Sequence, residues 1–189
     1  MNSQQIKEIL LSEIHEVSIN YEKYCNNPKR DFSRKRKLPF ELMLKNIIGM
    51  GSKSITNELI DIFQAFGEMP SASAFVQQRT KIKPAALKAV FDGFMSRILA
   101  SADKMRILAV DGSDTQIETN PKDKMSHIPT SIDKKSFNLL HLNALYDLEE
   151  HVYTDAIIQA AKSQNEHGAL NEMVDRSEIP KALVIADRL

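Results

Sequence analysis

Two aspartates each follow a short apolar run, one in the middle of the chain and one at its end. Asp111 follows Ile107–Val110, and Asp187 follows Ala182–Ala186. A run of this kind predicts a buried strand, with the acid at its C-terminal end. If the two strands lie side by side and parallel, the carboxylates become neighbours, which repel each other unless a cation lies between them. We therefore predict that Asp111 and Asp187 bind Mg²⁺ or Mn²⁺, with two ions in a complete site for phosphoryl transfer.

The segments between these runs have the patterns needed to bring them together. Residues 137–148 and 152–158 alternate as a β-hairpin, and Ser163-Gln164-Asn165-Glu166 has the form of a capping box before a helix. The resulting order is strand, strand, strand, helix, strand. A right-handed crossover then places the last strand beside the first. We expect the 107–111 strand to lie between the first hairpin strand and the 183–187 strand.

The first half of the chain has helical periodicity instead. Apolar stripes within residues 6–17, 39–48, 55–66 and 84–98 predict a small helical bundle, and the period changes at residues 102–104. The expected fold class is α/β, with a helical region at 1–103 and a mixed sheet at 104–189. A hydrophobic content of 42% supports a folded core.

Charge and cysteine content limit the function classes. Residues 1–104 carry 16 Lys and Arg against 11 Asp and Glu, whereas residues 105–189 carry 9 against 14. A basic first half and an acidic second half suggest a polyanion-binding segment followed by a carboxylate site. The single Cys25 cannot form an intramolecular disulfide, and no apolar run reaches membrane-spanning length. We expect a cytoplasmic protein without a membrane partner or a small-molecule cofactor.

A basic run is the strongest candidate for nucleic-acid contact. Six of the nine residues from Lys29 to Lys37 are basic: Lys29, Arg30, Arg34, Lys35, Arg36 and Lys37. Such a run fits a solvated linker about as well as a phosphate-binding segment. The aromatic Phe32 and the helices that follow favour DNA. Those helices fit a helix-turn-helix and a purely structural bundle equally well.

These residues resemble a known family. The stretch Ile107-Leu108-Ala109-Val110-Asp111-Gly112-Ser113, the helix at Asn165-Glu166-His167 and the stretch Ala186-Asp187-Arg188 are similar to the DDE transposases of bacterial insertion sequences. The helices upstream also resemble the N-terminal region of such enzymes. The resemblance implies a ribonuclease H-like catalytic domain, binding of element-end DNA, and Asp111 and Asp187 as the first two metal-binding acids. Arg188 lies beside Asp187, where it could hold a phosphate, and it matches the family's Asp-Arg pair, although an ion-pairing role fits it nearly as well. A homo-oligomer stays open.

The resemblance also has a gap. The family's third acid, a glutamate in a Tyr-x-x-Arg-x-x-x-Glu motif, has no counterpart here, and Leu189 stands where the family continues with glycine. We expect an N-terminal fragment, whether by truncation, frameshift or an early end, that does not cut DNA alone. Two alternatives stay open: a non-catalytic DNA-binding regulator, and a phosphohydrolase of the haloacid dehalogenase type, for which the Asp111-x-x-Asp114 spacing is one residue too long.

The remaining polar residues suggest no further site. Asp114 fits a turn-stabilising role better than a metal ligand. His127, His141, His151 and His167 lack ligand spacing, so we expect ordinary surface or loop histidines.

Overall fold

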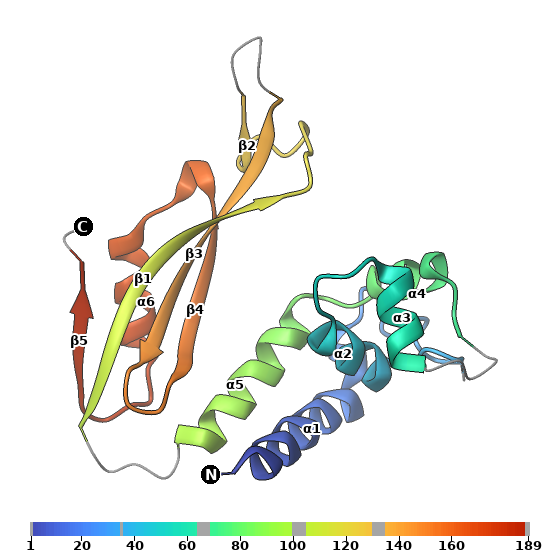
Figure 1. The fold of residues 1–189 in the computed structure, drawn as a ribbon, viewed down its shortest axis with the longest axis horizontal. Helices are drawn as coiled ribbons and strands as arrows, with labels where there is room; N and C mark the ends of the chain where they lie inside the picture. Colours follow the sequence, from blue (N-terminus) through green and yellow to red (C-terminus); the bar gives the residue numbers. More distant parts are fainter. Residues whose placement is uncertain (1, 35, 64–68, 100–104, 130–134, 188–189) are drawn as a thin grey trace. The chain divides into compact units, whose positions relative to one another are not determined.

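The computed structural model describes residues 2–34, 36–63, 69–99, 105–129 and 135–187 (Figure 1). The chain divides into two compact units, Met1–Ala100 and Ser101–Leu189, and each is described by itself. The domain boundary expected between residues 103 and 104 lies outside the described residues, as does the end of the helix expected to reach Phe66.

The first unit is helical. Its elements are α1 (Ser3–Ile19), the 3-10 helix η1 (Tyr21–Tyr24), α2 (Phe40–Gly49), α3 (Ile55–Phe63), α4 (Ala72–Arg79) and α5 (Ala85–Leu99). Local sequence explains where several of them begin. Asn2 and Gln5 form a capping box at α1, and the Ser71 hydroxyl caps α4 by accepting from Ala74 N–H. Pro39, which has no N–H to lose, precedes α2.

Apolar stripes of these helices build two buried clusters. One joins α1, α2 and α5 through Ile14, Leu44 and Val90. The other includes Leu38, Met43, Leu59 and Phe75. Partly buried Phe32 packs against both clusters, so the segment between α1 and α2 is anchored in the core of the unit.

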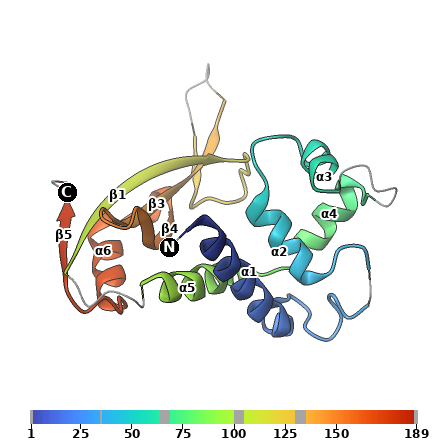
Figure 2. The same ribbon diagram turned by 60° about the horizontal axis from the view of Figure 1, so that its bottom comes forward.

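The second unit is a mixed sheet with a helix. Its elements are β1 (Arg106–Ile117), β2 (His127–Ile128), β3 (Phe137–Asp147), β4 (Val152–Ala160), the 3-10 helix η2 (Ala161–Ser163), α6 (Glu166–Asp175) and β5 (Ala182–Ala186). The strand order is β2-β3-β1-β5, with β4 also paired to β3. β1 is antiparallel to β3 and parallel to β5, as the crossover of α6 requires (Figures 1 and 2). The α/β class and the position of β1 between β3 and β5 are therefore confirmed.

The prediction that the first strand stops at Asp111 is wrong. β1 continues for six more residues because its backbone keeps pairing with β3, as far as Ile117 opposite Asn138. Asp111 lies in the middle of β1. It nevertheless marks the point where pairing with β5 ends, since Val110 opposite Ala186 is the last parallel pair.

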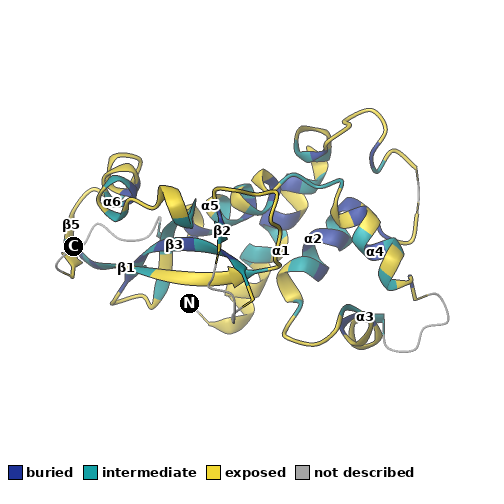
Figure 3. Cartoon of the chain, turned by 90° about the horizontal axis from the view of Figure 1, so that it is seen from above, coloured by how far each residue is buried: buried dark blue, intermediate teal, exposed yellow. Residues whose placement is uncertain are grey.

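The two faces of the sheet differ. Leu108, Leu145 and Met173 form a buried cluster between the sheet and α6. Because side chains alternate along a strand, Asp111 points to the face away from α6. Leu183 and Ile185 of β5 share that face by register and are about half exposed, at 50% and 48%. In Figure 3 the C-terminal half of β1 is largely exposed, whereas β3 is buried or intermediate.

One local expectation is also corrected, and a second is made more specific. α6 begins with Asn165, whose side chain accepts from Gly168 N–H, and Ser163 lies in η2 instead of capping the helix. The turn-rich sequence of residues 117–135 predicts a loop or a mobile insertion, and the described part of this segment is a loop fixed to β3. The fully buried Asn138 accepts from Asn120 N–H and donates to Ser126 Oγ at 2.7 Å, which ties residues 120–126 to β3. Residues 130–134 lie outside the described part.

Candidate functional site

Of the two predicted acids, Asp111 lies within β1 and Asp187 directly follows β5, the parallel neighbour of β1. The last pair in the register is Val110 with Ala186, so each acid is the residue that comes next along its own segment. Both are exposed, and both belong to the face away from α6. Adjacent strands lie roughly 4.8 Å apart, which places the two carboxylates within the span that one hydrated cation can bridge. The backbone thus brings together the two acids that the sequence singles out.

The donor chemistry of this pair suits a hard divalent cation. Both side chains offer carboxylate oxygens, which Mg²⁺ and Mn²⁺ prefer, and Asp111 Oδ1 already accepts from Gly112 N–H at 2.9 Å. Within the described ranges, no group of three His, Cys, Asp or Glu side chains could hold a metal ion. The pair therefore supplies part of a coordination sphere, and water or a phosphate oxygen must supply the rest.

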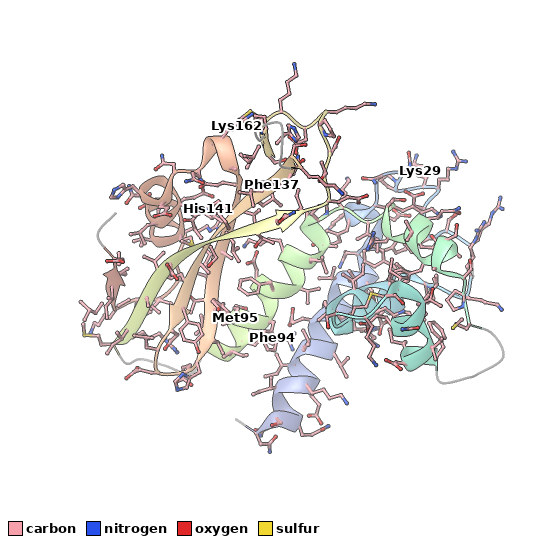
Figure 4. The ribbon with its side chains drawn as sticks, turned by 45° about the horizontal axis from the view of Figure 1, so that its top comes forward. Lys29, Phe94, Met95, Phe137, His141 and Lys162 are labelled. Carbon is pink, nitrogen blue, oxygen red and sulfur yellow. The ribbon has the colours of Figure 1, made fainter. Side chains whose placement is uncertain are left out.

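A second acidic cluster lies on the opposite face, and sequence reasoning missed it. His141 of β3 is only 5% exposed (Figure 4). Its Nδ1 lies 2.8 Å from Asp114 Oδ1, and its Nε2 lies 3.0 Å from Glu166 Oε1. The second contact is close enough for electrostatic pairing but is not aligned as a hydrogen bond. His141 is therefore not a surface histidine, and Asp114 does not stabilise a turn. β1 continues beyond Asp111 and includes Asp114, which lies opposite His141 of β3.

Gly112 makes this cluster possible. A Cβ at Gly112 would lie 2.6 Å from His141 Nε2 and 2.8 Å from Glu166 Oε1, closer than real contacts allow. The cluster ties the first turn of α6 to β1 and β3 one residue from Asp111. We interpret it as a support that fixes the strand carrying Asp111.

A buried ion pair supports the start of the same strand. Arg106 and Asp147 are 2% and 0% exposed, and Arg106 Nη1 donates to Asp147 Oδ2 at 2.6 Å. The other oxygen of Asp147 accepts from Glu149 and Glu150 N–H in the turn before β4. Burial alone would raise the pKa of Asp147, but the Glu150 N–H, Arg106 and the Glu149 N–H together hold it below its usual value.

The basic run is a folded loop, not an extended linker. Asp31, which is 5% exposed, accepts from Asn27 N–H at 2.9 Å, and Asp31 N–H donates back to Asn27 O at 2.8 Å. Phe32 follows with a φ of 58° and sets its ring edge-on to Phe40, with centroids 5.2 Å apart. A bulky residue in this left-handed conformation needs support from its surroundings, which the aromatic contact provides. Phe32 is therefore an anchor of the loop and not an exposed stacking platform.

The basic side chains of this loop face solvent. Lys29, Arg30, Arg34 and Arg36 are exposed, and among the described residues they form no ion pair (Figure 4 labels Lys29). Lys37 is also exposed. Lys35 and Arg188 lie outside the described residues. The fold thus displays cations on a fixed backbone, which is the arrangement that phosphate binding needs.

Cys25 is not a reactive group of this loop. It is completely buried, and burial, assisted by the negative charge of Asp31, raises its pKa to about 11. A thiol with this pKa stays protonated near neutral pH and is a poor metal ligand or nucleophile.

Comparison with known proteins supports one family. Residues 102–189 match the family model described as the transposase DDE domain. No curated protein and no solved structure matches the chain. In the described part of the chain, no helix is long and apolar enough to cross a membrane.

Proposed function

We propose that the chain takes part in metal-dependent phosphoryl transfer on DNA, because residues 102–189 match the family model described as the transposase DDE domain. The observation that carries the proposal is the parallel register of β1 and β5, which sets Asp111 beside Asp187. In this proposal the two aspartates hold Mg²⁺ or Mn²⁺, with two ions in a complete site. The bound metal would activate the attacking oxygen and stabilise the leaving oxygen of a phosphodiester.

The other residues of the second unit have supporting roles in this proposal. The His141 cluster and the Arg106–Asp147 pair hold β1 against β3 and α6. The backbone that carries Asp111 is therefore fixed before a metal ion binds, so that little conformational entropy is lost on binding. The haloacid dehalogenase alternative has no support here, because β1 is flanked by an antiparallel strand and the domain matches another family.

We expect weak metal binding that depends on both aspartates. Because the two acids leave much of the coordination to water, the Mn²⁺ dissociation constant should be on the order of 10⁻⁴–10⁻³ M by calorimetry. Asp111→Asn and Asp187→Asn should each abolish measurable binding. Asp175→Asn, which makes the same change at an exposed position on α6, is the matched control. Unchanged binding in Asp111→Asn would refute the site.

The helical unit is proposed to bind DNA through its basic loop. A regulator that binds DNA without cutting it would use the same surface. The basic loop therefore fits a DNA-cleaving transposase and a non-catalytic DNA-binding regulator equally. Self-association is a separate proposal. Among the described residues β5 stands at one end of the strand order, and a strand at a sheet edge can pair with a second chain.

Neutralising the loop should weaken duplex binding in a salt-dependent way. Each phosphate contact contributes a slope of roughly −0.9 to the dependence of log affinity on log salt concentration. Replacing Arg34, Lys35, Arg36 and Lys37 with glutamine should therefore flatten the slope measured by fluorescence anisotropy on a duplex. Glutamine at Lys45 and Lys88, which pair with Glu41 and Asp92, should leave the slope unchanged. Equal slopes in the loop variant and the wild type would make the run a plain linker.

A further inference from the structure

The basic loop forms one wall of a cleft. The cleft has a volume of about 630 Å³ and lies wholly within the first unit. One wall is formed by residues from the loop between α1 and α2, among them Lys29, Arg30, Arg34 and Arg36. The other wall is formed by Gln78, Thr80 and Lys81 at the end of α4. Cations thus face the cleft from two segments about fifty residues apart in the chain.

Backbone hydrogen bonds fix the two walls at their base. Asn26 N–H donates to Lys81 O at 2.9 Å, and the Asn26 side chain donates to Thr80 O at 2.8 Å. Lys83 N–H donates to Tyr24 O at 2.8 Å, and Cys25 forms an antiparallel bridge with Ile82. The spacing of the walls is therefore set by the fold and does not depend on a ligand.

The charges inside the cleft are positioned for an anion. The carboxylate of Asp31, the acid in the lining, is directed to Asn27 and is 5% exposed. Lys81 Nζ donates to Gln78 Oε1 at 2.8 Å, a neutral acceptor that positions the ammonium without cancelling its charge. An anion in the cleft would thus meet uncompensated positive charge from both walls.

The size of the cleft selects the kind of anion. A volume of a few hundred cubic ångströms holds one or two nucleotide units but not a double helix, whose two strands and paired bases are far larger. A strand that lies in the cleft with its bases as well as its phosphates must therefore be unpaired. Positively charged grooves that follow a single backbone are the usual means of binding single strands.

We propose that this cleft binds a single DNA strand, with phosphates held between the basic loop and Lys81. The proposal rests on the proposed function. It adds that the bound DNA is single-stranded and that Lys81 contacts it. The cations of the basic loop contact both duplex and single-stranded DNA in this proposal, whereas Lys81 contacts only the single strand.

The test compares single-stranded and duplex DNA on the same variants. Fluorescence anisotropy is measured with an oligothymidylate of about 10 nucleotides and with a blunt duplex, over a range of salt concentrations. Lys81→Gln should weaken oligothymidylate binding about fivefold at roughly 0.1 M salt and reduce the slope by about 0.7, the value for one single-strand phosphate contact. Duplex affinity should stay within about twofold of the wild type, since that partner lies outside the cleft.

Matched variants keep the outcomes separate. Lys83→Gln makes the same charge change two residues away, outside the cleft lining, and should leave both affinities unchanged. Lys81→Arg should retain oligothymidylate binding, which excludes a folding defect as the cause of the loss. Oligothymidylate binding that is equal in Lys81→Gln and wild type, with duplex binding still lost in the loop variant, would overturn the cleft and leave DNA binding intact. Wild-type protein that binds neither DNA would overturn both proposals.

Discussion

Asp147→Asn is expected to destabilise residues 101–189 by about 3–5 kcal/mol, the usual cost of removing one partner of a buried ion pair. Arg106 is 2% exposed and would lose the buried carboxylate to which its Nη1 donates. A domain of this size has a stability of roughly 5–15 kcal/mol, so the variant should be largely unfolded or close to it. The helical unit, with its own core clusters, should retain its structure.

Hydrogen exchange separates the two units in this experiment. Amides of β1 and β3 should lose protection in Asp147→Asn, while those of α1 and α5 keep it. Glu172→Gln removes an exposed pair with Arg176 and should cost no more than about 0.5 kcal/mol. The double variant Arg106→Met with Asp147→Leu should restore much of the protection, because an apolar pair of similar volume removes the buried guanidinium together with the carboxylate. Full protection in Asp147→Asn would show that the pair is not a structural requirement.

The same pair makes the second unit sensitive to acid. The pKa of Asp147 is lower in the folded protein than in the unfolded chain, where it is about 3.9. Its contribution is therefore complete above the unfolded pKa and is lost as the pH falls through the folded pKa. In the double variant this part of the acid dependence should disappear.

The second large effect is expected at His141. His141→Ala should destabilise the second unit by about 2 kcal/mol, because it removes a buried ring that contacts Asp114 and Glu166 and leaves a cavity. The two carboxylates are 54% and 37% exposed, so solvent screens part of the electrostatic loss.

The measurement is urea unfolding of the variant beside a histidine control. His167→Ala replaces an exposed histidine next to Glu166 on α6 and should change the unfolding midpoint little. Gly112→Ala offers an independent check, because its Cβ would displace His141 and Glu166 while keeping every charge. If His141→Ala and His167→Ala unfold at the same urea concentration, the cluster does not support β1.

The strands that carry the acids could be predicted, because each begins as a short apolar run with a distinct end. The length of β1 beyond Asp111 could not be predicted in the same way. Gly112–Gln116 have no apolar pattern, and they extend β1 only because β3 offers backbone partners as far as Asn138. Because the apolar run ends at Val110, the sequence predicts a strand end at Asp111. The crossover correctly predicts that this part of β1 lies beside β5.

The supporting contacts depend on pairs that are distant in the sequence. His141 meets Asp114 across 27 residues, and Arg106 meets Asp147 across 41. Neither pair has a spacing signal, although a histidine and an aspartate inside alternating apolar strands are unusual enough to suggest buried partners. In the first unit, composition alone identified the basic run. Its folded shape depends on Phe32 and on hydrogen bonds from Asn26 to the end of α4, which composition does not reveal.

Paramagnetic broadening by Mn²⁺ tests the central claim most directly, because it locates the cation instead of only detecting it. In an amide spectrum titrated with substoichiometric Mn²⁺, signals of residues 110–112 and 186–187 should disappear first, and Asp111→Asn should prevent their loss. Amides of α6 on the other face of the sheet should persist to higher Mn²⁺ concentrations. Broadening that begins at residues 166–168, or that is the same in wild type and Asp111→Asn, would contradict a metal site formed by Asp111 and Asp187.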